Sequence, residues 1–382
     1  MNRRLRQSLA FVCFALLAQA ADAFVYGQST TISQSPSDQF TAYVTSKATP
    51  GRHPIRSFEI ALAPLNDGTS SPVVTALAGT HDGKFLAAAG DDHAIRIIDL
   101  QARRVLHTLE GHIDWIQSLA FASDSQTLYS CGDDGRVLKW SQRFPVEPEV
   151  VIELPYSLRS LTCSHSQGLL AVGGFSNEIL LLDSENGNVL RRLACDCNDQ
   201  RCVRFSPDGK RILCGSRDGE LRVWNTKTGQ LIAEIHEHTR RIRTASFSVD
   251  GRRVASAGED RLLVQYDLET QTVVSKHDLA GSKLMSLCMV NNDLVAVAGA
   301  DNSVHLFDAL ADEVVADLNG HIGTVAVMTP CGDQLASGSF DTTIRIWDLN
   351  SIDLEAIGLR KINGGKPVSH APIKMDARLR IR

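Results

Sequence analysis

The sequence predicts an all-β fold in which a unit of four short antiparallel strands is repeated seven times and the units close into a ring. An Asp followed by an alternating apolar run recurs along most of the chain, at intervals of 40 to 42 residues. Within each interval, turn-forming residues separate short apolar runs that are typical of strands. Hairpins of this length cannot bury their faces alone, whereas stacked units can.

The recurring strip sets the number of units. It starts at Asp92, Asp134, Ser176, Asp218, Asp260, Asp301 and Asp341, and it ends six positions later at Ile98, Trp140, Leu182, Trp224, Tyr266, Phe307 and Trp347. Six nearly equal intervals between these strips indicate seven units in sequence, which is the signature of a repeat architecture.

The unit around Asp218 shows how each repeat is built. Its strands are expected at 202–205, 211–214, 221–224 and 231–235. Ser206-Pro207-Asp208-Gly209 forms the first turn, because Pro presets φ and Gly supplies positive φ. Arg217-Asp218-Gly219 forms a tight second turn, and residues 225–229 form the third. In the first unit, the corresponding strands start at Val73, Phe85, Ile95 and Val105.

Composition places the chain among globular proteins. Hydrophobic residues make up 43% of the 382 residues and charged residues 22%, which excludes collagen-like and largely disordered classes. Both ends are basic, and removing them leaves 29 basic and 42 acidic residues in 24–355, a net charge of −13. A body this acidic repels phosphates and anionic lipids, so we expect neither nucleic acid nor a membrane as partner.

Four motifs carry a resemblance to a known family. They are Leu109-Glu110-Gly111-His112, Leu318-Asn319-Gly320-His321, Phe205-Ser206-Pro207-Asp208-Gly209 and Ile344-Arg345-Ile346-Trp347-Asp348. Together with the period, they make residues 55–350 resemble a WD-repeat β-propeller. The resemblance implies seven four-stranded antiparallel blades. It also implies a ring closed by an N-terminal strand, for which residues 57–62 are the candidate, and this closure protects the sheet edges.

The resemblance also implies a hydrogen-bonded tetrad inside several blades. The expected sets are His112, Ser130, Asp134 and Trp140; His238, Ser256, Asp260 and Tyr266; and His321, Ser337, Asp341 and Trp347. We expect the Asp to accept hydrogen bonds from the His and the hydroxyl, and the His to reach the indole N–H. Asp196 stands at the His position of the fourth unit, and Ser176 replaces the Asp of the third.

The repeat argues against catalysis. His112, His238 and His321 recur at one structural position, whereas a catalytic constellation is normally single, so we expect no catalytic residue and no cofactor. Cys195, Cys197 and Cys202 cluster, but no fourth ligand has zinc spacing, so no metal is expected; a disulfide among them stays open. Four other cysteines lie in predicted apolar strands, and we expect them to be small core residues: Cys131, Cys163, Cys214 and Cys288.

One face of the ring is the expected interaction surface. Partners of this family contact the start of each first strand and the residue before the turn Asp. The resemblance carries these positions to Trp115, Gln117, Arg159, Asp199, Arg201, Arg241 and Arg243, and to Phe175, Arg217, Glu259 and Phe340. Five of these are Arg on three consecutive units, which predicts a basic sector that binds a protein or an acidic peptide. The alternative is that these Arg pair with neighbouring acids such as Asp199.

The N-terminus predicts export. Arg3, Arg4 and Arg6 precede an apolar run at 9–18 and two small-residue sites, so residues 1–23 read as a secretory signal peptide cleaved after Ala20 or Ala23. The apolar run is too short for a membrane anchor. The mature chain is then periplasmic or secreted, with a mitochondrial presequence as the minor alternative. Residues 24–54 form a polar, poorly ordered lead-in, 55–355 the propeller and 356–382 a basic tail.

The function that these patterns favour is an exported, non-catalytic scaffold for protein–protein interaction, monomeric as a ring and part of a larger assembly. The alternative is a propeller enzyme with chemistry or a metal at the central channel, similar to quinoprotein or lactonase propellers. Such an enzyme needs convergent carboxylates, His or metal ligands on the channel-lining strands. Here the first strand of each unit is mainly apolar, which favours binding over catalysis.

Overall fold

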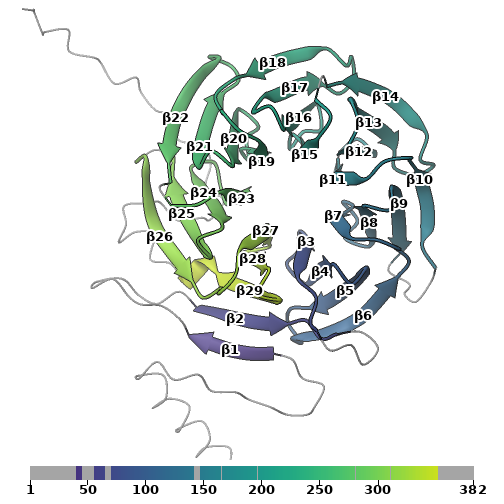
Figure 1. Cartoon of the computed structure of the whole chain (residues 1–382), viewed down its shortest axis with the longest axis vertical. Coiled ribbons are helices and arrows are strands. Elements are labelled where there is room, and N and C mark those ends of the chain that lie inside the picture. Colours follow the sequence, from purple (N-terminus) through teal and green to yellow (C-terminus); the bar gives the residue numbers. More distant parts are fainter. Residues whose placement is uncertain are drawn as a thin grey trace, which may run out of the picture.

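The computed structural model describes residues 40–44, 56–64, 70–141, 147–164, 166–195, 197–279, 281–309 and 311–351. Its strands form seven antiparallel sheets arranged as blades around one centre (Figure 1), which confirms the predicted seven-bladed propeller. The predicted signal peptide 1–23, most of the lead-in 24–54 and the tail 356–382 lie outside the described residues. Among the described residues, no helix has the length and apolarity that crossing a bilayer requires.

Blades 1 to 3 follow one another along the chain. Blade 1 is β3 (Val74–Gly79), β4 (Phe85–Gly90), β5 (Ala94–Asp99) and β6 (Arg104–Glu110). Blade 2 is β7 (Ile116–Phe121), β8 (Thr127–Gly132), β9 (Arg136–Ser141) and β10 (Glu149–Glu153). Blade 3 is β11 (Leu158–Cys163), β12 (Leu169–Gly174), β13 (Glu178–Asp183) and β14 (Val189–Ala194).

Blades 4 to 7 continue the ring. Blade 4 is β15 (Gln200–Phe205), β16 (Arg211–Ser216), β17 (Leu221–Asn225) and β18 (Leu231–Ile235). Blade 5 is β19 (Ile242–Phe247), β20 (Arg253–Gly258), β21 (Leu262–Asp267) and β22 (Thr272–Asp278). Blade 6 is β23 (Leu284–Met289), β24 (Leu294–Gly299), β25 (Ser303–Asp308) and β26 (Glu313–Asn319). Blade 7 holds β27 (Val325–Cys331), β28 (Gln334–Ser339), β29 (Thr343–Asp348), β2 (Arg56–Ala61) and β1 (Phe40–Val44), and a 3-10 turn, η1 (Leu349–Ser351), follows β29.

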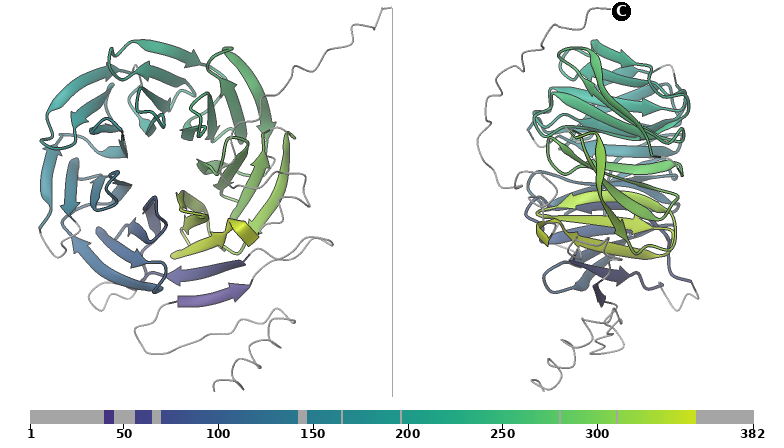
Figure 2. Two further views of the ribbon diagram at one scale, coloured as in Figure 1. Left: turned by 180° about the vertical axis from the view of Figure 1, so that it is seen from behind. Right: turned by 90° about the vertical axis from the view of Figure 1, so that its left-hand side faces the viewer.

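Blades 1 to 6 run outward from the centre in chain order, whereas in blade 7 the N-terminal strands β2 and β1 lie outside β29. The innermost strands β3, β7, β11, β15, β19, β23 and β27 surround the centre, and Figure 2 shows the same ring from behind and edge-on. The four strands predicted for the unit around Asp218 are β15 to β18. Its first turn forms as expected: the Gly209 N–H donates to the Ser206 carbonyl at 2.8 Å, and Gly209 has a φ of 70°.

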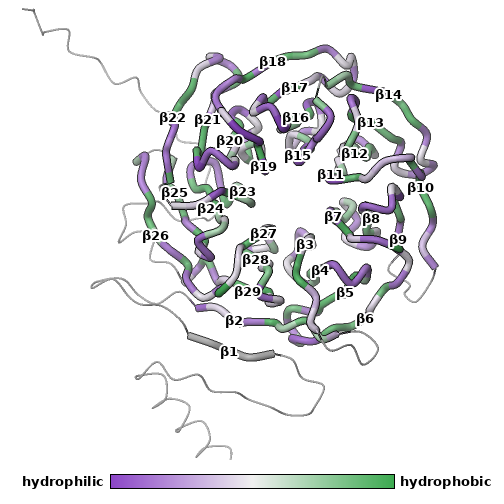
Figure 3. The backbone as a smooth tube through the Cα atoms, viewed as in Figure 1, coloured by the Kyte–Doolittle hydropathy of each residue, from purple (hydrophilic) through white to green (hydrophobic). Residues whose placement is uncertain are grey.

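The apolar core lies between neighbouring blades. Figure 3 shows hydrophobic residues along the strands of the blades. On β4 the consecutive residues 86–89 are all buried and apolar, and because successive side chains point to opposite faces, this sheet presents apolar side chains to both neighbours. Ala87 and Ile95 of blade 1 pack in one buried cluster with Ile116 and Leu128 of blade 2. Because every blade depends on the next in this way, an isolated blade has two uncovered apolar faces.

The ring closes through the N-terminal strand. β2 pairs antiparallel with β29, from Ser57 opposite Trp347 to Ala61 opposite Thr343. Ile60 is fully buried between blades 7 and 1, and Glu59 forms an ion pair with Arg345 of β29. The closing strand predicted at 57–62 is thus confirmed. β1, which pairs with β2, falls within the lead-in, where the sequence analysis predicted no strand.

Three blades contain hydrogen-bonded tetrads whose order differs from the expected one. His112 Nδ1 lies 2.8 Å from Asp134 Oδ2, and His112 Nε2 lies 2.7 Å from Ser130 Oγ. The Trp140 indole N–H donates to the same Ser130 Oγ at 2.8 Å. The Ser therefore joins His to Trp, and the expectation of a His–indole bond is wrong. Ser130 is the diagonal cross-strand neighbour of Trp140, whereas Asp134 sits beyond the strand end.

The set in blade 7 repeats this arrangement, and the set in blade 5 repeats its His–Asp and His–Ser contacts. His321 contacts Asp341 at 2.9 Å and Ser337 at 2.8 Å, and the Trp347 indole donates to Ser337 at 2.9 Å. His238 lies 3.0 Å from Asp260 and 2.8 Å from Ser256, while Tyr266 packs against the apolar cluster between blades 4 and 5. Each tetrad ties the connection that precedes an inner strand to the two middle strands of the same blade.

Hydrogen bonds keep the tetrad carboxylates ionised. Burial alone would raise the pKa of Asp341, but hydrogen bonds from His321, the Thr343 hydroxyl and the Ile322 N–H outweigh it and hold the pKa below its usual value. Asp134 shows the same balance, with His112 and Arg136 as its donors. A carboxyl whose pKa is lower in the folded state stabilises the fold above its ordinary pKa and loses this contribution as the pH falls.

Deleting residues up to 65 tests the closure. The shortened chain lacks β2, so Ile60 is lost and the edge of β29 is open, and we expect cooperative unfolding to disappear or its midpoint to fall steeply. Thermal unfolding followed by circular dichroism measures this. A chain that starts at residue 40 keeps both strands and serves as the control. Equal stability of the two chains would contradict closure by β2.

Asp341→Ala tests the tetrad. The substitution leaves the N–H groups of His321, Ile322 and Thr343 without their acceptor, which should cost about 1–3 kcal/mol of unfolding free energy. Ser176→Ala, at the matching position of blade 3, should cost clearly less, because the Ser176 hydroxyl is engaged in local turn contacts with Glu178 and the substitution keeps the backbone carbonyl that accepts from Gln200. Urea unfolding measures both, and equal losses would refute the proposed role of the network.

Asp341→Asn tests the electrostatic part. Because the lowered pKa stabilises the fold only while the carboxyl is ionised, the difference in urea midpoint between wild type and variant should shrink as the pH drops from about 7 to below about 4. A difference that stays constant over this range would show that the charge of Asp341 contributes nothing to stability.

Candidate functional site

Three consecutive blades carry an Arg at the same position of their inner strands. Arg159, Arg201 and Arg243 are the second residues of β11, β15 and β19, which lie side by side around the centre in Figure 1. Arg241 directly precedes β19. Because the repeat gives every inner strand the same direction, these four side chains come together at one end of the ring. We call Arg159, Arg201, Arg241 and Arg243 the arginine sector.

The sector is held by ion pairs that run from blade to blade. Asp199 is almost fully buried and pairs with Arg201 at 2.5 Å and with Arg241 at 3.1 Å. Asp199 therefore joins the inner edges of blades 4 and 5. The sequence left open the alternative that these Arg form ion pairs with acidic neighbours such as Asp199. For Arg201 and Arg241 this alternative is confirmed.

Two further carboxylates complete the network. Asp133 of blade 2 pairs with Arg159 at 3.2 Å and accepts a hydrogen bond from Gln117 Nε2 at 2.9 Å. Glu259 of blade 5 pairs with Arg241 at 3.2 Å and accepts from Arg243 Nε at 2.7 Å. The contacts thus form two groups, one around Asp133 and one that runs through Asp199 to Glu259.

Positive charge exceeds negative charge in this network. Four guanidinium groups share three carboxylates, and the Lys283 ammonium adds another cation 3.9 Å from Glu259. Burial lowers the pKa of Arg243, and the charges of Arg201 and Arg241 oppose its protonation further. Burial and the charge of Arg201 act on the pKa of Arg159 in the same direction. The guanidinium groups therefore repel one another, and an added anion would relieve this repulsion.

An exposed aromatic side chain lies against the sector. The guanidinium carbons of Arg159 and Arg201 stand 4.8 and 5.4 Å from the centre of the Phe175 ring, which is 40% exposed. This cation–π stacking orients both guanidinium planes and leaves apolar surface beside them. The four Arg side chains are between 18% and 23% exposed, so a partner reaches their charge without displacing them.

The remaining predicted surface residues divide by position. Trp115, 45% exposed, stands at the entry to β7, and its carbonyl accepts from the Asp133 N–H at 2.9 Å, so it borders the sector. Arg217 is exposed at the tight turn of blade 4. Phe340 is 48% exposed but belongs to blade 7, across the ring from the sector. The structure therefore groups Trp115 and Gln117 with the sector and leaves Phe340 apart from it.

Two exposed apolar residues that the sequence patterns did not single out lie on the connections into inner strands. Ile113 is 75% exposed and Ile322 is 86% exposed, and each directly follows a tetrad His. The repeated Gly-His-Ile sequence was the available signal, since a His that faces inward turns the next side chain outward. Ile113 lies two residues from Trp115 and enlarges the apolar surface there.

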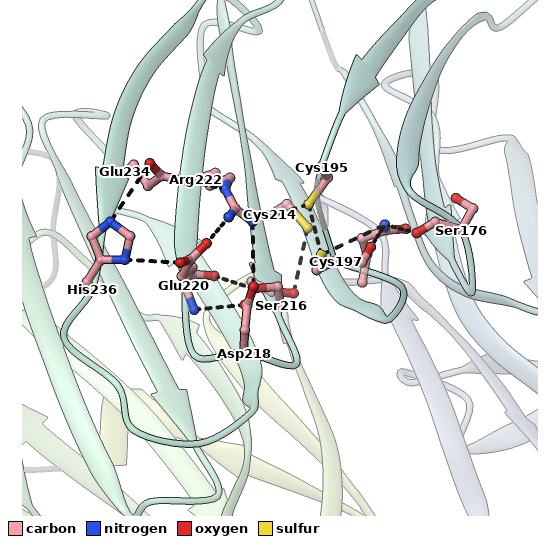
Figure 4. Close-up of polar contacts among 12 residues, drawn as sticks. Ser176, Cys195, Cys197, Cys214, Ser216, Asp218, Glu220, Arg222, Glu234 and His236 are labelled. Carbon is pink, nitrogen blue, oxygen red and sulfur yellow. Dashed lines mark hydrogen bonds and ion pairs between the residues drawn. The ribbon is translucent and has the colours of Figure 1, made fainter.

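One group of side chains has the spacing of a cation site. Ligand atoms of Glu220, Glu234 and His236 lie within 4.8 Å of one another on the outer part of blade 4 (Figure 4). The Arg222 guanidinium sits between the two carboxylates, forming an ion pair with Glu220 and one with Glu234 at 2.6 Å. Arg222 already supplies the positive charge that a metal ion would bring to these carboxylates, so we assign no metal to them.

The sequence matches a known family over half of its length. The family described as WD domain, G-beta repeat matches residues 62–99, 103–141, 187–225, 229–267 and 312–348. After the first, each matched segment contains the outer strand of one blade and the three inner strands of the next, and the tetrad-bearing blades 2, 5 and 7 are all included.

Several curated proteins are similar to this chain. Autophagy-related protein 16 of Arabidopsis thaliana is 25% identical over 280 residues, which cover 71% of this chain and 46% of that protein. Nuclear distribution protein PAC1-2 of Uncinocarpus reesii is 27% identical over 296 residues, or 65% and 62%. Small ribosomal subunit protein RACK1y of Oryza sativa subsp. japonica is 30% identical over 167 residues, or 41% and 49%.

These matches cover less than two thirds of the length of each relative. The similarity therefore concerns the repeat region of those proteins. The seven antiparallel blades, the matched segments and the His–Ser–Asp networks agree with one another. The chain belongs to the WD domain, G-beta repeat family.

Proposed function

We propose that this chain is a non-catalytic scaffold that binds an acidic segment of a partner protein at the arginine sector. The observation that carries the proposal is the surplus of guanidinium groups beside exposed aromatic surface, on a body with a net charge of −13 over 24–355. A carboxylate-bearing peptide neutralises the surplus charge, and its apolar side chains cover Phe175 and Trp115. Arg and Trp are also among the residues most enriched in interface hot spots.

The pairing of the carboxylates supports binding over catalysis. Asp133, Asp199 and Glu259 each accept charge-assisted contacts from Arg, so their lone pairs serve the network. A general base or a metal ligand needs a carboxylate with a free lone pair aimed at a reactant. The ion pairs of these three carboxylates with Arg therefore favour a binding role over the alternative of a channel enzyme.

The setting of this function is also a proposal. The leader at 1–23 supports export to the periplasm or out of the cell, where the ring acts as one subunit of a larger assembly. Some relatives carry names that refer to nuclear distribution, a ribosomal subunit or a nucleolar RNA, and these names describe those proteins. The acidic body of this chain argues against nucleic acid as its partner.

Peptide binding tests the proposal directly. A fluorescein-labelled peptide of alternating Glu and Ala should bind the full chain, and binding should weaken as salt rises, because the attraction is electrostatic. A Lys–Ala peptide of equal length should not bind. Fluorescence anisotropy measures both. Equal binding of the two peptides, or binding of neither, would contradict an acidic ligand at this site.

Matched variants locate the site. Simultaneous Ala substitution of Arg201, Arg241 and Arg243 also strips the buried Asp199 of its partners, so a loss of stability would accompany any loss of binding. Arg243→Gln is cleaner, because Arg241 still pairs with Glu259. It should reduce Glu–Ala peptide binding about tenfold with little change in melting temperature.

Phe175→Ala and Phe340→Ala form a second pair. Both rings precede the turn of their blade and are similarly exposed, but only Phe175 stacks on the sector. Phe175→Ala should weaken peptide binding, whereas Phe340→Ala should leave it unchanged. Equal effects of the two substitutions would place the site away from the sector.

A further inference from the structure

The connection between blades 3 and 4 carries two cysteines whose sulfur atoms nearly touch. Cys195 directly follows β14, Cys197 lies three residues before β15, and both side chains are buried. Their Sγ atoms are 2.9 Å apart, which is closer than two unbonded sulfur atoms ordinarily approach. Figure 4 shows the two side chains in contact. A covalent S–S bond measures about 2.05 Å, so the two atoms need to close by less than an ångström to form one.

The repeat explains why sulfur gathers here. In blades 2, 5 and 7 a His on the incoming connection is tied to a Ser four residues before the turn Asp. Blade 4 has Cys214 at that Ser position, four residues before Asp218. Cys195, Cys197 and Cys214 pack with Trp224 in one buried cluster. In blade 4, contacts between sulfur atoms therefore take the place of the His–Ser hydrogen bond that holds this connection in blades 2, 5 and 7.

The structure separates Cys202 from this cluster. Successive residues of a strand point to opposite faces of the sheet, and on β15 Val203 packs with Cys195 and Cys197 whereas Cys202 packs with Leu213 and Ile242 toward blade 5. Of the three cysteines that the sequence left open as disulfide partners, Cys195 and Cys197 are the pair that the fold brings together.

The surroundings activate one thiol of the pair. The hydrogen bond from the Cys195 thiol lowers the pKa of Cys197, while the pKa of Cys195 itself is raised by the same contact. Gln200 Nε2 lies 3.9 Å from the Cys197 sulfur, and Arg222 Nη1 lies 3.7 Å from the Cys195 sulfur. Both are donors that stabilise a thiolate, which is the form that attacks a disulfide.

We propose that Cys195 and Cys197 form a reversible intramolecular disulfide that closes the connection between β14 and β15. The oxidant is a low-molecular-weight disulfide such as oxidised glutathione. The Cys197 thiolate attacks one of its sulfurs and releases one glutathione thiolate, and Cys195 then attacks the mixed disulfide and releases the second. Two electrons and two protons pass from the cysteines to the two glutathiones. The inference does not depend on partner binding.

Trypsin digestion tests the proposal, because cleavage after Arg residues places Cys202 and Cys214 on peptides other than the one that holds Cys195 and Cys197. Cleavage after Arg192, Arg201, Arg204, Arg211 and Arg217 places Cys195 with Cys197 in peptide 193–201, Cys202 in 202–204 and Cys214 in 212–217. The full chain is refolded in a mixture of reduced and oxidised glutathione, denatured, alkylated without reductant and digested. Peptide 193–201 should be unalkylated and about 2 Da lighter than its dithiol form. After treatment with dithiothreitol it should carry two alkyl groups.

Two single variants serve as controls. Cys197→Ser should leave Cys195 alkylated, and Cys214→Ser should leave the disulfide within 193–201 intact. Two alkyl groups on wild-type peptide 193–201 after oxidation would overturn the proposal, and so would a cross-link from it to 202–204 or 212–217. The wild-type digest decides the matter even where a variant fails to fold. It is also independent of the peptide-binding experiment, so the two proposals fail separately.

Discussion

Every blade of this ring buries its two faces against its neighbours, and the rest of the structure depends on that constraint. An apolar cluster is shared by blades 1 and 2, and another lies between blades 7 and 1, where Ile60 of the closing strand is fully buried. Four-stranded sheets of this size have too little surface to be stable singly. The pairing of β2 with β29 therefore supports all seven interfaces, because it removes the open edge that a linear stack of blades would leave.

Within this frame, the connections into the inner strands are pinned by different chemistry in different blades. Blades 2, 5 and 7 use His–Ser–Asp networks, whose carboxylates stay ionised because His and backbone donors outweigh the effect of burial on their pKa. Blade 4 uses the sulfur atoms of Cys195, Cys197 and Cys214 at the corresponding place. The ring tolerates this exchange because apolar packing between blades contributes more to the stability of the fold than these contacts do. The His–Ser–Asp and sulfur contacts mainly determine where each connection lies.

The arginine sector arises from the same repetition. Because each inner strand starts at the same end of the ring, single Arg residues that are 42 positions apart in the sequence, such as Arg159, Arg201 and Arg243, become neighbours. Asp133, Asp199 and Glu259 then determine how much of that charge is neutralised within the chain. The sector thus links blades 4 and 5, and it also forms a surface with a net positive charge next to the exposed ring of Phe175.

The sequence by itself determined the repeat, the number of blades, the strands of the unit around Asp218 and the strand that closes the ring, because period and turn residues are local signals that the chain carries in order. It also identified the members of each tetrad. Only the tertiary structure decided that Ser337 rather than His321 contacts the Trp347 indole, that Asp199 joins Arg201 to Arg241, and that Cys202 faces away from Cys195 and Cys197. These contacts depend on which face of a strand a side chain occupies and on how neighbouring blades pack. The spacing of residues along the chain predicts neither of these.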